Sequence, residues 1–536
     1  MSAMTTKKAI SMTRLLPLVM VVVTLLFATA AYAAAPGITG LTFSLTAQAA
    51  YITQPDGNMV YSWGYGCTST YTPTFNPPGT KMPGANCPTM QVPGPTLIVT
   101  EGQSITVTLT NNLPAAAGNT SILFPGFQVT ATNGVAGLLT GPTGDAPTNG
   151  TVTYNFTAGS PGTRAYYSGT QSDLQVEMGL YGAIIVLPDP AKAPTCANAN
   201  LAAEQANSEV DYRLTANGAA FDHAASCYDR EYLFQFSEMD PVIHTQAEQQ
   251  VAAIAHCVPS TVRPCPTSLD VHTEPYHPAY FMINGRSMPD DMDTNYAAQY
   301  PHQPYNGNPH MHPGELVLLR IIGQGRWQHP FHEHGNHVRI LAHDGNLILS
   351  ATDPSKLAGP LLFTTTTTPG VAMDGIFYWT GKGLNWDIYG HNPNSSDPLA
   401  KLPCTPDANG YNTGSPGALN YYEWCPDHNK ALEKAPFGDV AGNGPVTLPD
   451  SNILTNGAWF GGSAYLGPNA TGRAVGPTGT TPPSGTIANP PGSEAGLAFM
   501  WHSHNEREIT TNNIFPGGMM MMMLVDSREF QINESF

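Results

Sequence analysis

Alternating apolar and polar residues mark most of the chain and predict β-strands. In the segments Leu97-Ile-Val-Thr and Ile105-Thr-Val-Thr-Leu, the alternation has a period of two. Successive side chains on such segments lie on opposite faces of a sheet. The intervening turn, Glu101-Gly-Gln, predicts that the two segments form a hairpin. Because this alternation recurs along the chain, we expect an all-β protein.

The β-rich segments fall into two regions, which predict two Greek-key β-sandwich domains. The first domain is expected at 34–190 and the second at 229–536, joined by an Ala- and Asn-rich linker at 191–228. Within the second domain, residues 392–495 are crowded with Pro, Gly, Asn and Ser, and the apolar periodicity fades. We interpret 392–495 as a long irregular insertion.

Composition agrees with this fold class and limits the partners. Only 11% of the residues are charged, whereas the chain has 53 Gly and 49 Pro, which favours strands and loops over helices. The net charge of −18 disfavours binding to nucleic acid or to anionic membranes. The same charge is compatible with metal cations as partners.

The N-terminus predicts an export signal. Three cations precede an apolar run at residues 15–28, and Ala31-Tyr-Ala33 has the small-x-small pattern of a cleavage site. We therefore expect a signal peptide at 1–33 and a secreted protein, either periplasmic or extracellular. The apolar run is short for a membrane span, and no second candidate segment follows it.

Eight cysteines are expected to form four disulfides in an exported protein. They occur as near neighbours, so sequential pairing is the simplest connectivity, and none has a CxxC spacing that would indicate a metal site. The expected pairs are Cys67 with Cys87, Cys196 with Cys227, Cys257 with Cys265, and Cys404 with Cys425.

The histidines carry the candidate chemistry. All seventeen lie after residue 222, so the first domain has none. His332 and His334 are two residues apart, as are His502 and His504, and residues at this spacing share one face of a strand. Two facing strands would therefore present four nitrogen donors, which suit copper, zinc, nickel or iron. A hydrogen-bonded polar layer without metal is the alternative.

Several motifs resemble those of multicopper oxidases. His329-Pro-Phe-His-Glu-His-Gly is similar to their HPxHxHG motif, and Trp501-His-Ser-His occupies the place of their WHCH motif. Val92-Pro-Gly-Pro-Thr and Met178-Gly-Leu-Tyr-Gly resemble segments of the family's first domain. The resemblance implies cupredoxin-like domains, copper as cofactor and an oxidoreductase activity. It also makes a homotrimer possible, since two-domain members commonly assemble in this way.

The sequence departs from the family at the copper ligands. Segments 123–127 and 166–170 resemble the two first-domain histidine motifs but contain no histidine. Ser503 stands in place of the type 1 cysteine, and Glu508 in place of a type 1 histidine. Because a blue-copper site requires the thiolate, we expect no type 1 copper.

By the resemblance, the retained ligands all come from the second domain. His329 corresponds to a type 1 ligand, His332 to a type 2 ligand, and His334, His502 and His504 to type 3 ligands. A mononuclear or loosely binuclear copper site is expected from this reduced set. The residues that could complete it are His337, Glu506, Glu508, His310 and His312. For His310 and His312, a solvated loop is the favoured interpretation.

Five consecutive methionines, Met519 to Met523, follow a Pro-Gly-Gly turn. A closing core strand explains them best, because methionine fills gaps on both faces of a strand. A stripe of thioethers for Cu(I) is the alternative.

Three functions remain open. The first is a copper oxidoreductase that oxidises phenolics or reduced metal ions with oxygen. The second is an exported copper-binding or storage protein without turnover, and the third is a structural extracellular protein. No residue is assigned a catalytic role from the sequence.

Overall fold

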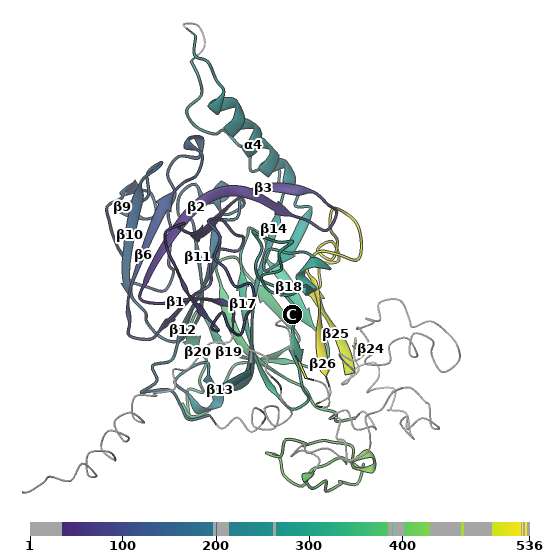
Figure 1. The fold of residues 1–536 in the computed structure, drawn as a ribbon. Coiled ribbons are helices and arrows are strands. Elements are labelled where there is room, and N and C mark those ends of the chain that lie inside the picture. Colours follow the sequence, from purple (N-terminus) through teal and green to yellow (C-terminus); the bar gives the residue numbers. More distant parts are fainter. Residues whose placement is uncertain are drawn as a thin grey trace, which may run out of the picture.

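A computed structural model shows a protein built of β-sheets (Figure 1). The structure describes residues 35–196, 200, 209, 214–260, 264–383, 389, 401–428, 462–465, 496–526, 528 and 531–532. The expected signal peptide and most of the expected insertion lie outside these residues. The strands form two sandwiches, so the predicted fold class is confirmed.

The first sandwich packs two five-stranded sheets around a core that includes Trp63, Val107 and Ile184. One sheet has the order β11 (Gly162–Tyr167), β12 (Tyr181–Leu187), β5 (Leu97–Thr100), β1 (Gly37–Thr39), β4 (Thr74–Asn76). The other has the order β3 (Met59–Cys67), β2 (Thr42–Thr53), β6 (Ser104–Asn111), β10 (Thr151–Thr157), β7 (Thr130–Thr132). A small hairpin joins β8 (Val135–Gly137) to β9 (Gly141–Asp145).

The predicted hairpin between β5 and β6 is wrong. β5 pairs with β1 and β12, whereas β6 pairs with β2 and β10 in the opposite sheet. The turn at Gly102, with φ at +80°, therefore carries the chain from one sheet to the other. Val99 and Ile105 belong to the same core, so alternation alone could not distinguish this corner from a hairpin.

The second sandwich has a larger pair of sheets. The first contains β13 (Leu214–Ala219), β14 (Cys227–Met239), β17 (Leu316–Gly323), β23 (Ala372–Tyr378), β19 (Val338–His343) and β20 (Asn346–Leu347), with β15 (Tyr280–Ile283) and β21 (Leu361–Leu362) at its margins. The second contains β16 (His310–Met311), β26 (Met520–Asp526), β25 (Gly496–Ser503), β18 (His329–Glu333) and β22 (Thr364–Thr367), with β24 (Gly462–Tyr465) beside β25. Their core includes Phe331, Phe499 and Trp501.

Two elements fall outside the sequence expectations. β13 lies inside the segment expected as a linker and pairs with β14. The helix α4 (Pro241–Ala255) follows β14, with Pro241 in its first turn and the Asp240 side chain accepting from the Val242 amide. In Figure 1, α4 extends from the top of the molecule. None of the described helices is long and apolar enough to cross a membrane.

A buried ionic contact ties the two sandwiches together. Asp374 on β23 accepts a hydrogen bond from the Thr163 hydroxyl on β11 at 2.6 Å. Arg320 on β17 reaches the same carboxylate at 3.2 Å and also pairs with Glu231. Because the side chains of Arg320, Asp374 and Glu231 are nearly inaccessible to solvent, this contact fixes the first sandwich against the second.

All four predicted disulfides are present. Their Cα–Cα separations range from 5.5 Å for Cys67–Cys87 to 5.8 Å for Cys257–Cys265. The other pairs are Cys196–Cys227 and Cys404–Cys425. Sequential pairing is therefore the connectivity of this fold.

Candidate metal centre and its buried neighbour

The central strands of one second-domain sheet position the histidines. β18 and β25 are antiparallel, with His332 directly opposite His502. On either side of this pair, Phe331 and Trp501 point into the apolar core. Because side chains alternate along a strand, the two imidazoles lie on the outer face of the sheet. His334 and His504 follow immediately after the ends of the two strands.

The structure brings these four rings together, and we call His332, His334, His502 and His504 the four-imidazole cluster. Ring centroids lie 4.7 Å apart for His332 and His334, 5.2 Å for His334 and His502, and 4.9 Å for His332 and His504. The closest ring nitrogens are Nε2 of His334 and Nε2 of His502, at 3.3 Å. Three of the rings are buried, whereas the His504 side chain is 53% exposed.

Neighbouring oxygens orient two of the rings. Nδ1 of His332 lies 2.7 Å from the Thr364 hydroxyl on β22, and Nδ1 of His502 lies 2.7 Å from the Ser503 carbonyl oxygen. Burial, together with the neighbouring His502 and His504, lowers the pKa of His332 to about 4. Burial also lowers the pKa of His502. Both rings are therefore neutral at pH 7 and keep their lone pairs.

The positions expected to correspond to a type 1 centre form a separate buried group. Glu508 accepts from the Ser503 hydroxyl, and its Oε2 lies 2.8 Å from Nδ1 of His329. These three residues come from β18, the end of β25 and the loop that follows it. Their contact agrees with the motif resemblance, by which Ser503 and Glu508 stand where the family has a cysteine and a histidine. We call His329, Ser503 and Glu508 the His–Ser–Glu triad.

His329 is held at both ring nitrogens. Its Nε2 lies 3.0 Å from Glu238 Oε2, opposite the contact with Glu508. Burial opposes the charged ring, but hydrogen bonds to Glu238 and Glu508 outweigh it and raise the pKa of His329 to about 9. An imidazolium bound to two carboxylates has no lone pair for a metal. In this arrangement both ring nitrogens of His329 contact carboxylate oxygens.

Sequence reasoning missed Glu238, which lies 91 residues before His329 on β14. Its other oxygen accepts from the Trp327 amide at 2.8 Å and from the Tyr276 hydroxyl at 3.1 Å. The same Tyr276 hydroxyl lies closer, at 2.7 Å, to a carboxylate oxygen of Glu177 in the first sandwich, so its one proton is shared between the two carboxylates. No local sequence motif predicts these contacts, because Glu177, Glu238 and His329 come from different segments of the chain.

The remaining expected ligands are distributed as follows. Glu506 is exposed and lies 3.5 Å from Nδ1 of His504, so it is near the cluster. His337 is exposed, and its ring packs against Phe363 at 5.0 Å. Phe363 also contacts the ring of His332 at 5.7 Å, which places His337 at the margin of the cluster.

The expected solvated loop at His310 and His312 is wrong. Both rings are buried, and His310 lies in β16, where its Nδ1 is 2.7 Å from Asp526 Oδ2. His312 contacts the Asp526 carbonyl oxygen through Nδ1 and Glu209 Oε2 through Nε2, at 2.8 and 2.6 Å. Burial lowers the pKa of His312, but Glu209 outweighs it, so the net shift is upward. His310 and His312 therefore both contact Asp526, the last residue of β26.

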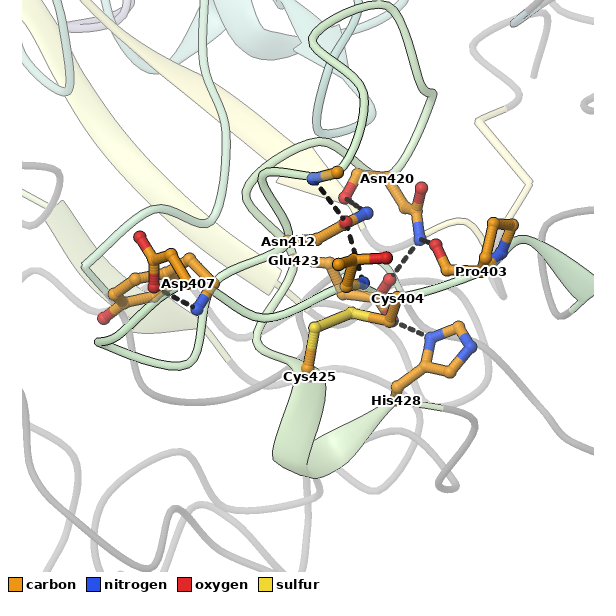
Figure 2. The surroundings of a disulfide bond; sticks show 11 residues. Pro403, Cys404, Asp407, Asn412, Asn420, Glu423, Cys425 and His428 are labelled. Carbon is orange, nitrogen blue, oxygen red and sulfur yellow. Dashed lines mark hydrogen bonds and ion pairs between the residues drawn. A yellow bond between two sulfur atoms is a disulfide. The ribbon is translucent and has the colours of Figure 1, made fainter.

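A second group of metal-type ligands occurs in the described part of the insertion. The group consists of Cys404, Glu423 and His428, whose three potential ligand atoms all lie within 4.8 Å of one another. Among the residues that the structure describes, no other set of His, Cys, Asp or Glu side chains meets this criterion. Figure 2 shows that the Cys404 sulfur is bonded to Cys425, while His428 faces the Glu423 carboxylate. Because a disulfide sulfur is not a thiolate, this group is a cross-linked loop and not a metal site.

Most of the first sandwich matches a known protein family. Residues 76–191 match the family model described as multicopper oxidase. This part of the chain is a multicopper oxidase domain. The family's cofactor is copper, and its chemistry is that of a copper oxidoreductase. The resemblance inferred from the sequence motifs is thereby confirmed.

Solved structures similar to the chain include the multicopper oxidase mgLAC and the blue copper oxidase of Nitrosomonas europaea. Each is 15% identical and covers 90% of this chain, and 86% and 85% of the other chain, with TM-scores of 0.41 and 0.43. The copper nitrite reductase of Nitrosomonas europaea is 17% identical over 64% of this chain and 86% of its own, with a TM-score of 0.38. No curated protein matches the sequence. Similarity at these levels adds nothing to the family match.

The multicopper oxidase domain replaces its two expected histidine motifs by aromatic packing. Leu123 and Tyr167 form a β-bridge, so segments 123–127 and 166–170 do lie side by side. The Phe124 ring packs on Tyr166 at 5.9 Å and on Phe156 at 4.9 Å. In the described structure these two segments therefore contribute to an aromatic cluster.

The donor chemistry of the four-imidazole cluster fits copper. Two nitrogens bound to one ion at bonds of about 2.0 Å and a tetrahedral angle lie about 3.3 Å apart, and His334 and His502 have this separation. The contacts of His332 with Thr364 and of His502 with a carbonyl oxygen are those that ligating histidines typically make through the other nitrogen. No three of these four imidazoles have ring nitrogens that all lie within 4.8 Å of one another.

Proposed function

We propose that this protein is an exported copper oxidoreductase whose copper is held by the four-imidazole cluster. The observation that supports this most directly is the 3.3 Å approach of Nε2 of His334 to Nε2 of His502, whose Nδ1 lies 2.7 Å from the Ser503 carbonyl oxygen. His332 and His504 complete the set, with Glu506 beside His504. Bound copper would supply one-electron chemistry with oxygen.

The low pKa of His332 favours binding of a metal ion over binding of a proton at this site. A proton competes with a metal for the same lone pair, and the low pKa of His332 weakens this competition above about pH 4. The exposed side of the cluster consists of His504 and Phe363, which is 52% exposed. A small phenol or a reduced metal ion would approach there, because no separate type 1 centre is available to collect electrons.

Export is supported by the four disulfides, because such bonds persist in oxidising compartments. The N-terminal pattern of residues 1–33 supports the same proposal.

A copper-binding protein without turnover is the second candidate function. The His–Ser–Glu triad favours it, because a serine and a carboxylate replace the thiolate through which electrons normally enter. In this function the cluster would store or carry copper, and the fold would be retained without the reaction.

One set of measurements separates the two. Copper per chain is measured on the purified mature protein together with its EPR spectrum, and oxygen uptake is then followed with phenols, Fe(II), Mn(II) and Cu(I). The oxidoreductase predicts bound copper with substrate-dependent oxygen uptake, whereas the carrier predicts bound copper without it. Absence of copper after loading would refute both.

Two variants test the ligands. His502→Ala/His504→Ala should lose the bound copper and any oxygen uptake. His343→Ala is the matched control, since His343 is an exposed histidine at the end of β19 in the opposite sheet. Copper retention by the double variant at the wild-type level would refute the proposed site.

A further inference from the structure

The five consecutive methionines divide between the two faces of one sheet. Met519, Met521 and Met523 are fully buried in the core between the sheets of the second sandwich. Met520 and Met522 therefore lie on the outer face, the face that also carries the four-imidazole cluster. The predicted closing core strand accounts for the first three methionines and leaves the other two to be explained.

The outer methionines have specific neighbours. In the pairing of β25 with β26, Met522 lies opposite Met500, and Met520 lies opposite His502. Directly opposed residues in an antiparallel pair have Cβ atoms about 5 Å apart. A third methionine, Met292, comes from the short 3-10 turn η4 (Asp290–Met292) and packs on the same group. Its sulfur accepts from the Met522 amide at 3.4 Å.

We propose that Met292, Met500 and Met522 form a binding site for Cu(I), separate from the four-imidazole cluster. Thioethers are soft, uncharged ligands that select Cu(I) over Cu(II) and over hard cations. Met292 and Met500 both pack against the small cluster that contains Met522, so side chains from three different elements lie on one patch of the sheet. We call them the outer methionine cluster.

Accessibility distinguishes this cluster from core packing. Met292 and Met500 are partly exposed and Met522 is 9% exposed, whereas the inner methionines of β26 are closed off from solvent. Gap filling explains methionine where the surroundings are irregular and dry. A partly open group of three thioethers leaves a path by which an ion can enter.

The loop that carries Met292 is held in place. Arg286 is fully buried, and its Nη1 donates to the main-chain oxygens of Asp290, Asp293 and Thr294 at 3.4, 3.3 and 3.1 Å. A fixed main chain on both sides of Met292 limits the entropy lost when its thioether binds an ion. The exposed Asp293 beside it adds negative potential that favours a cation.

Met520 connects the outer methionine cluster to the imidazoles, because it lies two residues before Met522 on β26 and directly opposite His502 on β25. The same face of β25 and β26 therefore presents soft sulfur ligands at one end and nitrogen ligands at the other. Binding of Cu(I) by the sulfur atoms does not depend on copper at the imidazoles.

The test uses Ag(I), a redox-inert probe for soft monovalent ions, on the full mature chain. The triple variant Met292→Leu/Met500→Leu/Met522→Leu keeps side-chain volume. Met521→Leu is the matched control, because Met521 belongs to the same strand but faces the core. Silver per chain is measured after gel filtration against a competing thioether ligand, and X-ray absorption reports the bound atoms.

Wild type and the Met521→Leu control are expected to retain one more Ag(I) per chain than the triple variant, with sulfur as the neighbouring atoms. His332→Ala/His502→Ala should retain this Ag(I), which separates the site from the proposed copper centre. Equal silver binding by the triple variant and wild type, with equal thermal unfolding, would overturn the proposal. Loss of the silver in the histidine variant alone would also overturn it.

Discussion

Nδ1 of His329 lies 2.8 Å from Oε2 of Glu508, in a region where both side chains are closed off from solvent. In the family motif this histidine would bind type 1 copper. Here the ring is an imidazolium between two carboxylates, and its pKa is raised to about 9. The two carboxylates, Glu238 and Glu508, both favour the protonated form of this ring.

The raised pKa makes stability depend on pH in a defined direction. His329 binds its proton more tightly in the folded than in the unfolded chain, whose histidine pKa is about 6.5. Its stabilising contribution should therefore be fully present below about pH 6.5 and be lost as pH rises through about 9. The free energy of unfolding, measured by denaturant titration, should differ more between wild type and His329→Gln at pH 6 than at pH 10. An unchanged difference would show that folding does not shift the pKa of His329.

Restoring the family's ligand types should restore the spectrum of a type 1 centre. Ser503 and Glu508 already contact each other, and Glu508 contacts His329. We expect Ser503→Cys/Glu508→His to give an intense visible absorption band after Cu(II) loading, since a thiolate and two imidazoles would then face one point. Wild type and Glu508→His alone should lack the band, because they have no thiolate. Such a band in wild type would contradict the assignment of Ser503.

Thr364 should affect copper affinity without being a ligand. Its hydroxyl lies 2.7 Å from Nδ1 of His332 and fixes the direction of the opposite nitrogen. Thr364→Val should weaken copper binding by about 10- to 100-fold, as is typical for partners of ligating histidines. Chelator competition measures this change. Thr366→Val, on the exposed part of the same strand, should leave the affinity unchanged.

The contact between the sandwiches should contribute strongly to stability. Asp374 is buried and is shared by Thr163 and Arg320. Asp374→Ala leaves the Arg320 charge with one fewer partner and should lower the free energy of unfolding by about 3 to 5 kcal/mol. Denaturant titration measures it. Glu274→Ala removes an exposed pair with Arg326 and should cost about 1 kcal/mol or less.

The sequence by itself determined the fold class, the disulfides and the face on which four histidines meet. These follow from short-range rules: a period of two fixes which residues share a face of a strand, and near-neighbour cysteines can pair across short loops. His332 and His502 lie opposite each other because both belong to strands whose alternation is readable. The same rule divides the methionines of β26 into inner and outer sets.

The tertiary structure decided what each group contacts. Glu238 reaches His329 from 91 residues away, and Glu209 reaches His312 from 103 residues away. Such contacts depend on how sheets pack, which local periodicity does not encode. For the same reason the turn at Gly102 joins two sheets instead of closing a hairpin. A buried charge is stable only beside a partner of opposite charge. The raised pKa of His329 therefore follows from the positions of Glu238 and Glu508, which only the tertiary structure gives.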